Sequence, residues 1–342
     1  MLVKTILTMI CACLILASCT KVAHSFTDIE TFKVESVWNK SPFNAFTDLI
    51  FYDSMYYCAF REAETHVSYD GKIRVIVSRD GNTWNNFSVL EEDKKDLRDP
   101  HFYIDNNGFL CIGTNARKTD DSRQSLIYKL KNGSFGQPDI MDADNDYYLW
   151  SFSKFKDSVY SIGFNLKQPC YSMGGVNNKL KISLFNNKDV RCIGFKDIIT
   201  NNWITDSFAC PSEASIIFTP DSNLISIVRD QDILGYSHIG ISKYPFNKWE
   251  WKKFPYYIRG PKLALLPDGK LFLSGASLID LHKTYYVILN PKKDFAIETI
   301  KTLPSDGDSG YPGVIVEGSS VLLSYYSSHE GNARVYIARF NY

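Results

Sequence analysis

The sequence lacks several features that would each point to a particular class of protein. Its 38 Lys and Arg residues are balanced by 38 Asp and Glu residues, so it has no basic excess with which to bind nucleic acid. It has no Cys-x-x-Cys spacing, and this argues against a zinc site or a disulfide framework. It has no long stretch of helical periodicity. Beyond its first twenty residues it also has no apolar run that approaches the length of a membrane-spanning helix.

The N-terminal residues have the pattern of a targeting segment. Lys4 precedes an apolar run from Ile6 to Leu16, shorter than the ~20 residues that a membrane-spanning helix needs. The run ends in Leu16-Ala17-Ser18-Cys19, which resembles a bacterial lipobox, where a signal peptide is cut before a cysteine that then carries lipid. We expect residues 1–18 to be a signal peptide and residues 19–33 to be a lipidated tether. The alternative is an ordinary signal peptide with a chance cysteine.

This segment predicts where the protein resides. Acyl chains contribute about 0.8 kcal/mol per buried methylene group, so several chains on Cys19 would hold the protein on a membrane. We therefore expect a secreted, membrane-anchored lipoprotein of the outer membrane, the cell surface or the periplasm. Cys58 and Cys111 lie inside apolar runs and are expected to be small buried side chains. Cys192 and Cys210 could pair in an oxidising compartment.

A turn followed by a strand recurs along the chain at intervals of roughly 50 residues. Each unit places Asp, Asn, Gly or Ser in a tight turn before a short apolar or aromatic run, the pattern of a hairpin that leads into a buried strand. The units begin at Asp53, Asp105, Lys156, Pro220, Pro267 and Glu317. A period near 50 residues with four short strands per unit is typical of a β-propeller.

The expected fold is therefore all-β, a single six-bladed β-propeller over residues 34–342. A seven-bladed count is the alternative if residues 190–210 contain a degenerate unit. The segment near Val34 to Val37 and the last strand from Val335 could together complete one blade, which would remove an open sheet edge.

Two motifs resemble those of a known family. Ser78 to Trp84 match the Asp-box, S-x-D-G-x-T-W, a hairpin turn typical of sialidases and their propeller relatives. The longer pattern that starts at Ala45, the DLRDP motif from Asp96, and the SGYPG and SYYSSHEG motifs near the C-terminus resemble sialidase-like propeller lipoproteins of carbohydrate-degrading bacteria. The resemblance covers essentially the whole mature chain and implies a sialidase-like fold and a carbohydrate substrate.

The resemblance also implies particular site residues. Glu213 and Arg229 are similar to the glutamate and second arginine of a sialidase site, and Tyr311 is similar to its nucleophilic tyrosine. A first arginine would fall near Phe46 to Leu49, where the sequence has none. Arg61 lies further along the same strand pair and is the alternative, and Arg259 is a loose match to a third arginine.

Charged residues also follow the apolar run of several units. If these runs are the inner strands of the blades, their ends converge at one mouth, and a guanidinium group there suits a carboxylate or sulfate because it binds oxyanions in two places. The residues predicted to bind substrate are Arg61, Glu62, His66, Arg98, Asp99 and Arg229. The residues predicted to be catalytic are Glu213, Tyr311, His329 and Glu330.

Each cluster also has a purely structural interpretation. Arg61 could pair with Glu62 at a solvated blade edge, and Arg98 and Asp99 could form a salt bridge between blades. Glu213 could merely neutralise the charge of Arg229.

The favoured function is an exo-acting glycoside hydrolase whose partner is an acidic oligosaccharide or polysaccharide. We expect a monomer that needs no metal and no cofactor. One alternative is a polysaccharide lyase, in which His66 or His329 together with Tyr311 abstracts the proton next to a uronate carboxylate. The other is a glycan-binding protein without catalytic activity.

Overall fold

A computed structural model describes residues 32–140, 147–165, 182–187, 196–197, 211–230, 236–246, 248–277 and 282–342. The predicted signal peptide and Cys19 lie outside the described residues, and so do Cys192 and Cys210. Cys58 and Cys111 are both buried, which confirms the expectation for these two. No helix in the described part of the chain is long and apolar enough to span a membrane.

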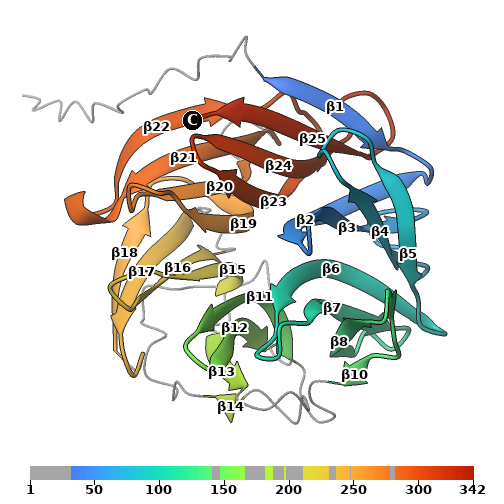
Figure 1. Cartoon of the computed structure of the whole chain (residues 1–342), viewed down its shortest axis with the longest axis horizontal. Coiled ribbons are helices and arrows are strands. Elements are labelled where there is room, and N and C mark those ends of the chain that lie inside the picture. The colour runs from blue at the N-terminus through green and yellow to red at the C-terminus, as the bar shows by residue number, and fades with distance from the viewer. Residues whose placement is uncertain are drawn as a thin grey trace, which may run out of the picture.

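The described strands form six antiparallel sheets around a common axis (Figure 1). The first contains β2 (Phe43–Tyr52), β3 (Met55–Ala63), β4 (Lys72–Ser78) and β5 (Asn85–Leu90). The second contains β6 (Lys95–Ile104), β7 (Leu110–Lys118) and β8 (Arg123–Lys131), with β9 (Ser134–Phe135) and β10 (Asp139–Ile140) both paired to β8. The third contains β11 (Tyr147–Phe155), β12 (Ser158–Asn165), β13 (Ile182–Asn187) and β14 (Lys196–Asp197).

The remaining three sheets complete the circle. The fourth contains β15 (Pro211–Phe218), β16 (Asn223–Asp230), β17 (Tyr236–Lys243) and β18 (Trp249–Phe254). The fifth contains β19 (Ile258–Leu265), β20 (Leu271–Ser277), β21 (Thr284–Asn290) and β22 (Ala296–Thr302), with a short 3₁₀ helix at Pro291–Lys293. The sixth contains β23 (Ser309–Glu317), β24 (Ser320–Ser327), β25 (Arg334–Asn341) and β1 (Lys33–Trp38).

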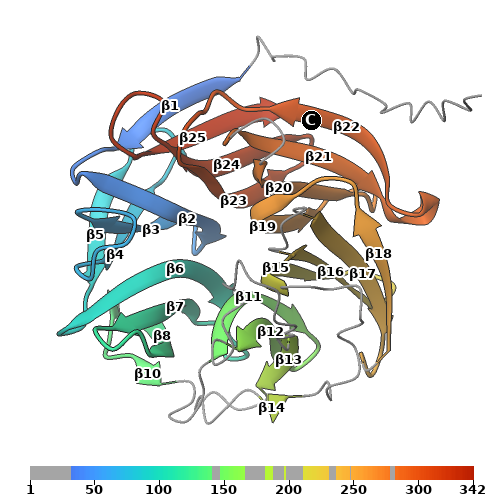
Figure 2. The same ribbon diagram turned by 180° about the vertical axis from the view of Figure 1, so that it is seen from behind.

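In the first five sheets, the strand that comes first along the chain lies at the axis. In the sixth sheet, β23 lies at the axis. These six innermost strands contact one another in a closed ring, β2 to β6, β11, β15, β19, β23 and back to β2. Figure 2 shows the same ring from the opposite side. The architecture is an all-β propeller, as predicted.

The N-terminal strand closes the circle. β1 pairs antiparallel with β25, with Lys33 opposite Arg339 and Ser36 opposite Tyr336. This pairing confirms the prediction that the two ends of the fold share one sheet. It covers an edge of β25 that would otherwise present unpaired backbone groups.

The repeated turn-and-strand units are the second strands of the sheets, not the innermost ones. They coincide with β3, β7, β12, β16, β20 and β24, so the prediction that they line the axis is wrong. The reason is burial, because second strands pack against neighbouring sheets. Ile112 of β7 lies in one apolar cluster with Ile73 and Val75, and Leu273 of β20 lies in another with Ile227. The innermost strands carry a less regular pattern because each contains a bulge.

These bulges recur at the same level in the innermost strands. The register with the second strand shifts between Ala45 and Asp48, Arg98 and His101, Leu149 and Ser151, Pro211 and Ala214, Arg259 and Lys262, and Gly310 and Gly313. In four of them a residue takes a positive φ, namely Phe46, Asp99, Gly260 and Tyr311. A bulge turns a side chain out of the regular pleat. The ring of bulges therefore points a set of side chains toward the axis.

Candidate active site at the propeller axis

Glu213 is the centre of a group of polar contacts contributed by three adjacent sheets. The Tyr311 hydroxyl donates to Oε1 at 2.8 Å, and the Arg229 guanidinium donates to the same oxygen. The backbone N–H of Gly260 donates to Oε2 at 2.7 Å. Glu213 is 7% exposed. The structure thus brings together the three residues that the family resemblance implied, which come from β15, β16 and β23.

Electrostatics keeps Tyr311 as a hydrogen-bond donor. Burial and the charge of Glu213 raise the pKa of Tyr311 well above its usual value, while Arg229 opposes the rise. Burial acts to lower the pKa of Arg229, but the charge of Glu213 together with Tyr311 and Tyr257 outweighs burial, and the pKa is raised. At neutral pH Tyr311 is therefore a phenol and Arg229 a guanidinium. A phenol next to a carboxylate base is an arrangement that can produce a nucleophile.

The backbone fixes the position of Tyr311. Its φ is +49°, and its carbonyl accepts a hydrogen bond from Thr47 Oγ1 at 2.8 Å. A Cβ on Gly260 would lie 2.5 Å from the tyrosine ring, so position 260 needs glycine. Thr47 stands where the sequence lacks the first arginine of a sialidase, and its hydroxyl instead ties β2 to β23.

A cavity opens at the axis beside Tyr311. Its empty volume is about 300 Å³, counting the part that is open to solvent. Its walls come from the bulges of five innermost strands and include Phe46, Thr47, Asp99, Pro100, His101, Trp150, Ser151, Gly260, Pro261, Lys262, Tyr311 and Pro312. A small concave site with a few convergent polar groups is typical of ligand-binding clefts.

Asp99 contributes a carboxyl group to this cavity wall. The Tyr148 hydroxyl donates a hydrogen bond to it, and the residue is 6% exposed. Burial raises the pKa of Asp99, and the charge of Arg98 and the hydrogen bond from Tyr148 only partly offset this effect. The sequence predicted Asp99 as a substrate-binding residue, and the structure places it at the cavity.

A second polar cluster at the cavity was missed by sequence reasoning. Asp48 accepts a hydrogen bond from Lys262 Nζ at 2.6 Å and one from the backbone of Phe102 at 2.8 Å. His101 lies nearby, and burial together with the charge of Lys262 lowers its pKa well below 6.5. Asp48, His101 and Lys262 each end a bulge, and a Pro precedes two of them, in Asp99-Pro100-His101 and Gly260-Pro261-Lys262. That recurrence was the available signal.

Arg259 has donors that no described residue accepts. Its Nε and Nη2 are buried, and within the described residues neither has a hydrogen-bond partner. Its charge acts to lower the pKa values of Asp308, Tyr311 and Tyr326. Sequence reasoning gave Arg259 only as a loose match to a third arginine and did not include it among the predicted site residues.

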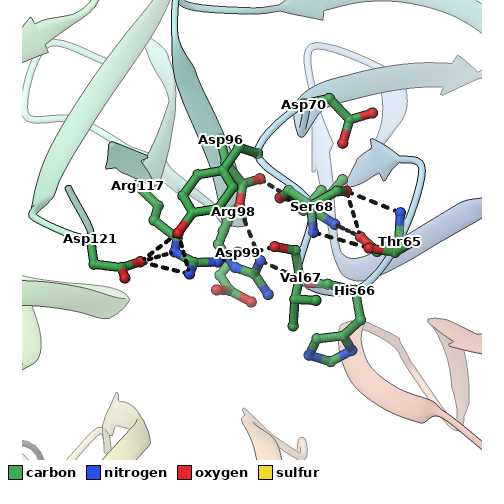
Figure 3. A network of polar contacts seen from close by, with 12 residues as sticks. Thr65, His66, Val67, Ser68, Asp70, Asp96, Arg98, Asp99, Arg117 and Asp121 are labelled. Carbon is green, nitrogen blue, oxygen red and sulfur yellow. Dashed lines mark hydrogen bonds and ion pairs between the residues drawn. The ribbon is translucent and has the colours of Figure 1, made fainter. Parts of the chain in front are cut away.

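Arg61 and Arg98 hold a loop in place. Arg61 is fully buried and donates to Asp96 at 2.7 Å and to the carbonyls of Thr65 and Ser68, both at 2.9 Å. Arg98 donates to the His66 carbonyl at 2.9 Å and to Asp96 at 3.0 Å, as Figure 3 shows. These contacts turn the guanidinium groups toward the backbone of the loop and toward Asp96, instead of toward the cavity as the sequence had suggested.

Three other predicted residues lie away from Glu213. Glu62 is 2% exposed and accepts hydrogen bonds from Trp38 Nε1 and from Arg74. His329 contacts the Ser327 hydroxyl and the ring of Tyr336. Glu330 pairs with Arg334 at 2.6 Å. Glu62 follows Arg61 on β3, whereas His329 and Glu330 lie in the loop between β24 and β25.

Comparisons with known proteins show the fold. No protein-family model matches the chain, and no curated protein matches its sequence. A protein of unknown function from Dyadobacter fermentans is 18% identical, with a TM-score of 0.76 over 92% of this chain and 100% of that one. The α-L-arabinanase of Penicillium chrysogenum is 13% identical, with a TM-score of 0.63 over 88% of this chain and 94% of that one. The sialidase of Trypanosoma rangeli is 12% identical, with a TM-score of 0.65 over 92% of this chain and 58% of that one. This chain therefore spans little more than half the length of the sialidase.

Proposed function

We propose that this protein is an exo-acting glycoside hydrolase that removes an acidic sugar from the end of a glycan. The observation that carries the proposal is the hydrogen bond from Tyr311 to Glu213, next to the axial cavity. Glu213 accepts the phenolic proton while the tyrosine oxygen attacks the anomeric carbon. Glycosidases with a tyrosine nucleophile are a known variant of the two-carboxylate mechanism.

The donors of Arg259 that have no acceptor among the described residues support an acidic substrate. A buried N–H without an acceptor costs free energy, and buried polar groups are nearly always satisfied. A carboxylate on the sugar would supply acceptors for Nε and Nη2, in the two-pronged geometry that guanidinium groups favour. The sialidase and arabinanase neighbours support a glycan as the substrate at the level of fold.

Further parts of the proposal concern the setting of the site. The Leu16 to Cys19 motif supports secretion and a lipid anchor, which would place the propeller as a monomer on a membrane surface. The six sheets support a count of six blades. The turn at Ser78 to Trp84 supports its interpretation as an Asp-box, because Asp80 Oδ1 accepts the backbone N–H groups of Asn82 and Thr83.

The test is turnover by purified protein. It is incubated with α-sialosides, with oligosaccharides that end in glucuronate, and with sulfated oligosaccharides, and released monosaccharide is measured. Tyr311→Phe is the matched variant, because it keeps the ring that packs on Gly260 and removes only the hydroxyl. We expect the wild type to release an acidic monosaccharide and the variant to lose at least about 100-fold in kcat, as for loss of a covalent catalytic group.

Two outcomes would contradict the proposal and point to the alternatives. An unsaturated product that absorbs in the ultraviolet, without hydrolysis, would indicate a lyase. Saturable binding of the same sugars with no turnover, and equal binding by a Glu213→Gln variant, would indicate a glycan-binding protein.

A further inference from the structure

His66 has one ring nitrogen bound to a carboxylate and its side chain open to solvent. Its Nδ1 lies 2.7 Å from Asp308 Oδ2, and the side chain is 45% exposed. The Tyr326 hydroxyl donates to the other oxygen of Asp308 at 2.7 Å. A histidine whose Nδ1 faces a carboxylate keeps Nε2 available for proton transfer, and the carboxylate orients the ring.

The loop that carries His66 is fixed by guanidinium groups from two sheets. The four successive carbonyls of residues 65–68 each accept a hydrogen bond from an arginine. Arg61 donates to the carbonyls of residues 65 and 68, and Arg98 donates to that of residue 66. Arg117 donates to the carbonyl of residue 67 at 3.2 Å. Figure 3 shows the imidazole of His66 pointing away from these arginines. Such support holds a side chain to a defined position, which catalysis requires.

His66 stands near the Tyr311 and Glu213 pair. Its ring centroid lies 5.2 Å from that of Phe46, and the Phe46 ring lies 4.9 Å from that of Tyr311. Tyr326, which binds Asp308, is 6.0 Å from Tyr311 between ring centroids. The histidine is therefore separated from the nucleophile candidate by about one aromatic ring, and it lies on the solvent side.

We propose that His66 is the general acid and general base of this hydrolysis, an inference that rests on the proposed function. In the first step the oxygen of Tyr311 bonds to the anomeric carbon and its proton passes to Glu213. The glycosidic C–O bond breaks, and the departing oxygen takes a proton from Nε2 of His66. In the second step water gives a proton back to Nε2 and its oxygen bonds to the anomeric carbon. The bond to Tyr311 breaks, and the proton on Glu213 returns to the phenolate.

The exposure of His66 favours it over Asp99 for this role. An exo-acting enzyme holds the terminal sugar in its cavity, so the leaving group extends toward solvent. Asp99 is 6% exposed and already accepts a hydrogen bond from Tyr148. His66 is exposed to solvent and its ring packs on Phe46 of the cavity wall, so it lies on the side toward which the departing oxygen would extend. Asp308 is then a positioning residue that orients the imidazole.

The experiment compares two leaving groups on one sugar. Wild type, His66→Asn and Asp308→Asn are assayed with 4-nitrophenyl and methyl glycosides of N-acetylneuraminic acid and of glucuronic acid. A nitrophenolate departs without protonation, whereas methoxide does not. We expect His66→Asn to lower kcat/KM at least about 100-fold on the methyl glycoside and less than about 10-fold on the nitrophenyl glycoside. Asp308→Asn should show the same preference with a smaller loss.

Val67→Thr is the matched control, because Val67 is an exposed side chain on the same loop and its carbonyl contact with Arg117 is unaffected. Equal losses on both glycosides, or a His66→Asn variant as active as Val67→Thr, would overturn the role of His66 and leave the hydrolase intact. A wild type that turns over no glycoside in the panel would overturn both proposals. Circular dichroism of each variant checks that the fold is retained.

Discussion

The molecule contains two groups of buried or partly buried arginines that differ in what their donors bind. Around the 65–68 loop, Arg61 and Arg98 give their donors to Asp96 and to backbone carbonyls. At the axis, Arg229 is paired with Glu213, but Nε and Nη2 of Arg259 have no partner among the described residues. Among the described residues, no buried donor of the first group lacks an acceptor, so this group stabilises the protein. The second has two buried nitrogens without an acceptor among the described residues, next to Gly260 of the cavity wall, as expected where a ligand supplies the acceptors.

The largest effect on the free energy of unfolding should come from removing the carboxylate of Asp96, which both Arg61 and Arg98 bind. Asp96 is fully buried and accepts from Arg61 at 2.7 Å and from Arg98 at 3.0 Å. Asp96→Ala leaves two buried guanidinium groups without their counter-ion, and such a loss typically costs about 3–5 kcal/mol. Urea denaturation measures the free energy of unfolding. Asp121→Ala is the control, because Asp121 pairs with Arg117 but is 63% exposed, and its loss should cost less than about 1 kcal/mol. If both variants lost the same free energy of unfolding, the buried ion pairs of Asp96 would be no more stabilising than the exposed ion pair of Asp121.

A second test separates the two arginines at the axis. Arg229→Met takes the counter-ion from the buried carboxylate of Glu213 and should lower the free energy of unfolding by about 3 kcal/mol. Arg259→Met removes no described hydrogen bond and eliminates two buried nitrogens that have no acceptor among the described residues, so stability should change by less than about 1 kcal/mol. The same Arg259→Met variant should lose affinity for acidic sugars, measured by titration calorimetry with N-acetylneuraminate and glucuronate. A large loss of stability in Arg259→Met would mean that its donors have a structural partner.

The sequence predicted the propeller because its signals are local and repeated. Turn residues such as Pro267-Asp268-Gly269 and the apolar runs behind them depend only on a hairpin and on burial between sheets. The repeated runs were placed at the axis, whereas they are second strands. Despite this error, several predicted residues lie close to the site. The reason is that antiparallel pairing places the end of a second strand beside the start of an innermost strand. Arg61, for example, lies opposite Ala45, next to the bulge at Phe46.

Other parts of the site were beyond the reach of sequence reasoning. Arg61 and Arg259 are the same residue type. They differ in which acceptors the fold brings next to their N–H groups, and this depends on residues that are distant in the sequence. Thr65 and Ser68, which accept from Arg61, belong to a loop whose path depends on packing against a second sheet. Bulges likewise leave no periodic signal, so the side chains that they turn toward the axis, such as Lys262, were missed.

The smallest expected effect concerns Asp308, which joins the two groups because it contacts His66 on the loop and interacts with the charge of Arg259. Burial acts to raise its pKa, but the hydrogen bonds from His66 and Tyr326, together with charge interactions with His66 and Arg259, outweigh burial and the pKa is lowered. A carboxyl group with a lowered pKa stabilises the fold above its usual pKa of about 3.9, and this contribution is lost as pH falls through the lower value in the folded state. Asp308→Asn keeps an acceptor for Tyr326 and removes the charge. It should therefore cost about 1 kcal/mol at pH 7, a size typical of a partly exposed pair, and progressively less below pH 4. Urea denaturation of both proteins at pH 7, 5 and 3 measures the difference. A cost that stays constant with pH would show that the charge of Asp308 contributes nothing to stability, and that the carboxylate matters only as a hydrogen-bond acceptor between the loop and the axis.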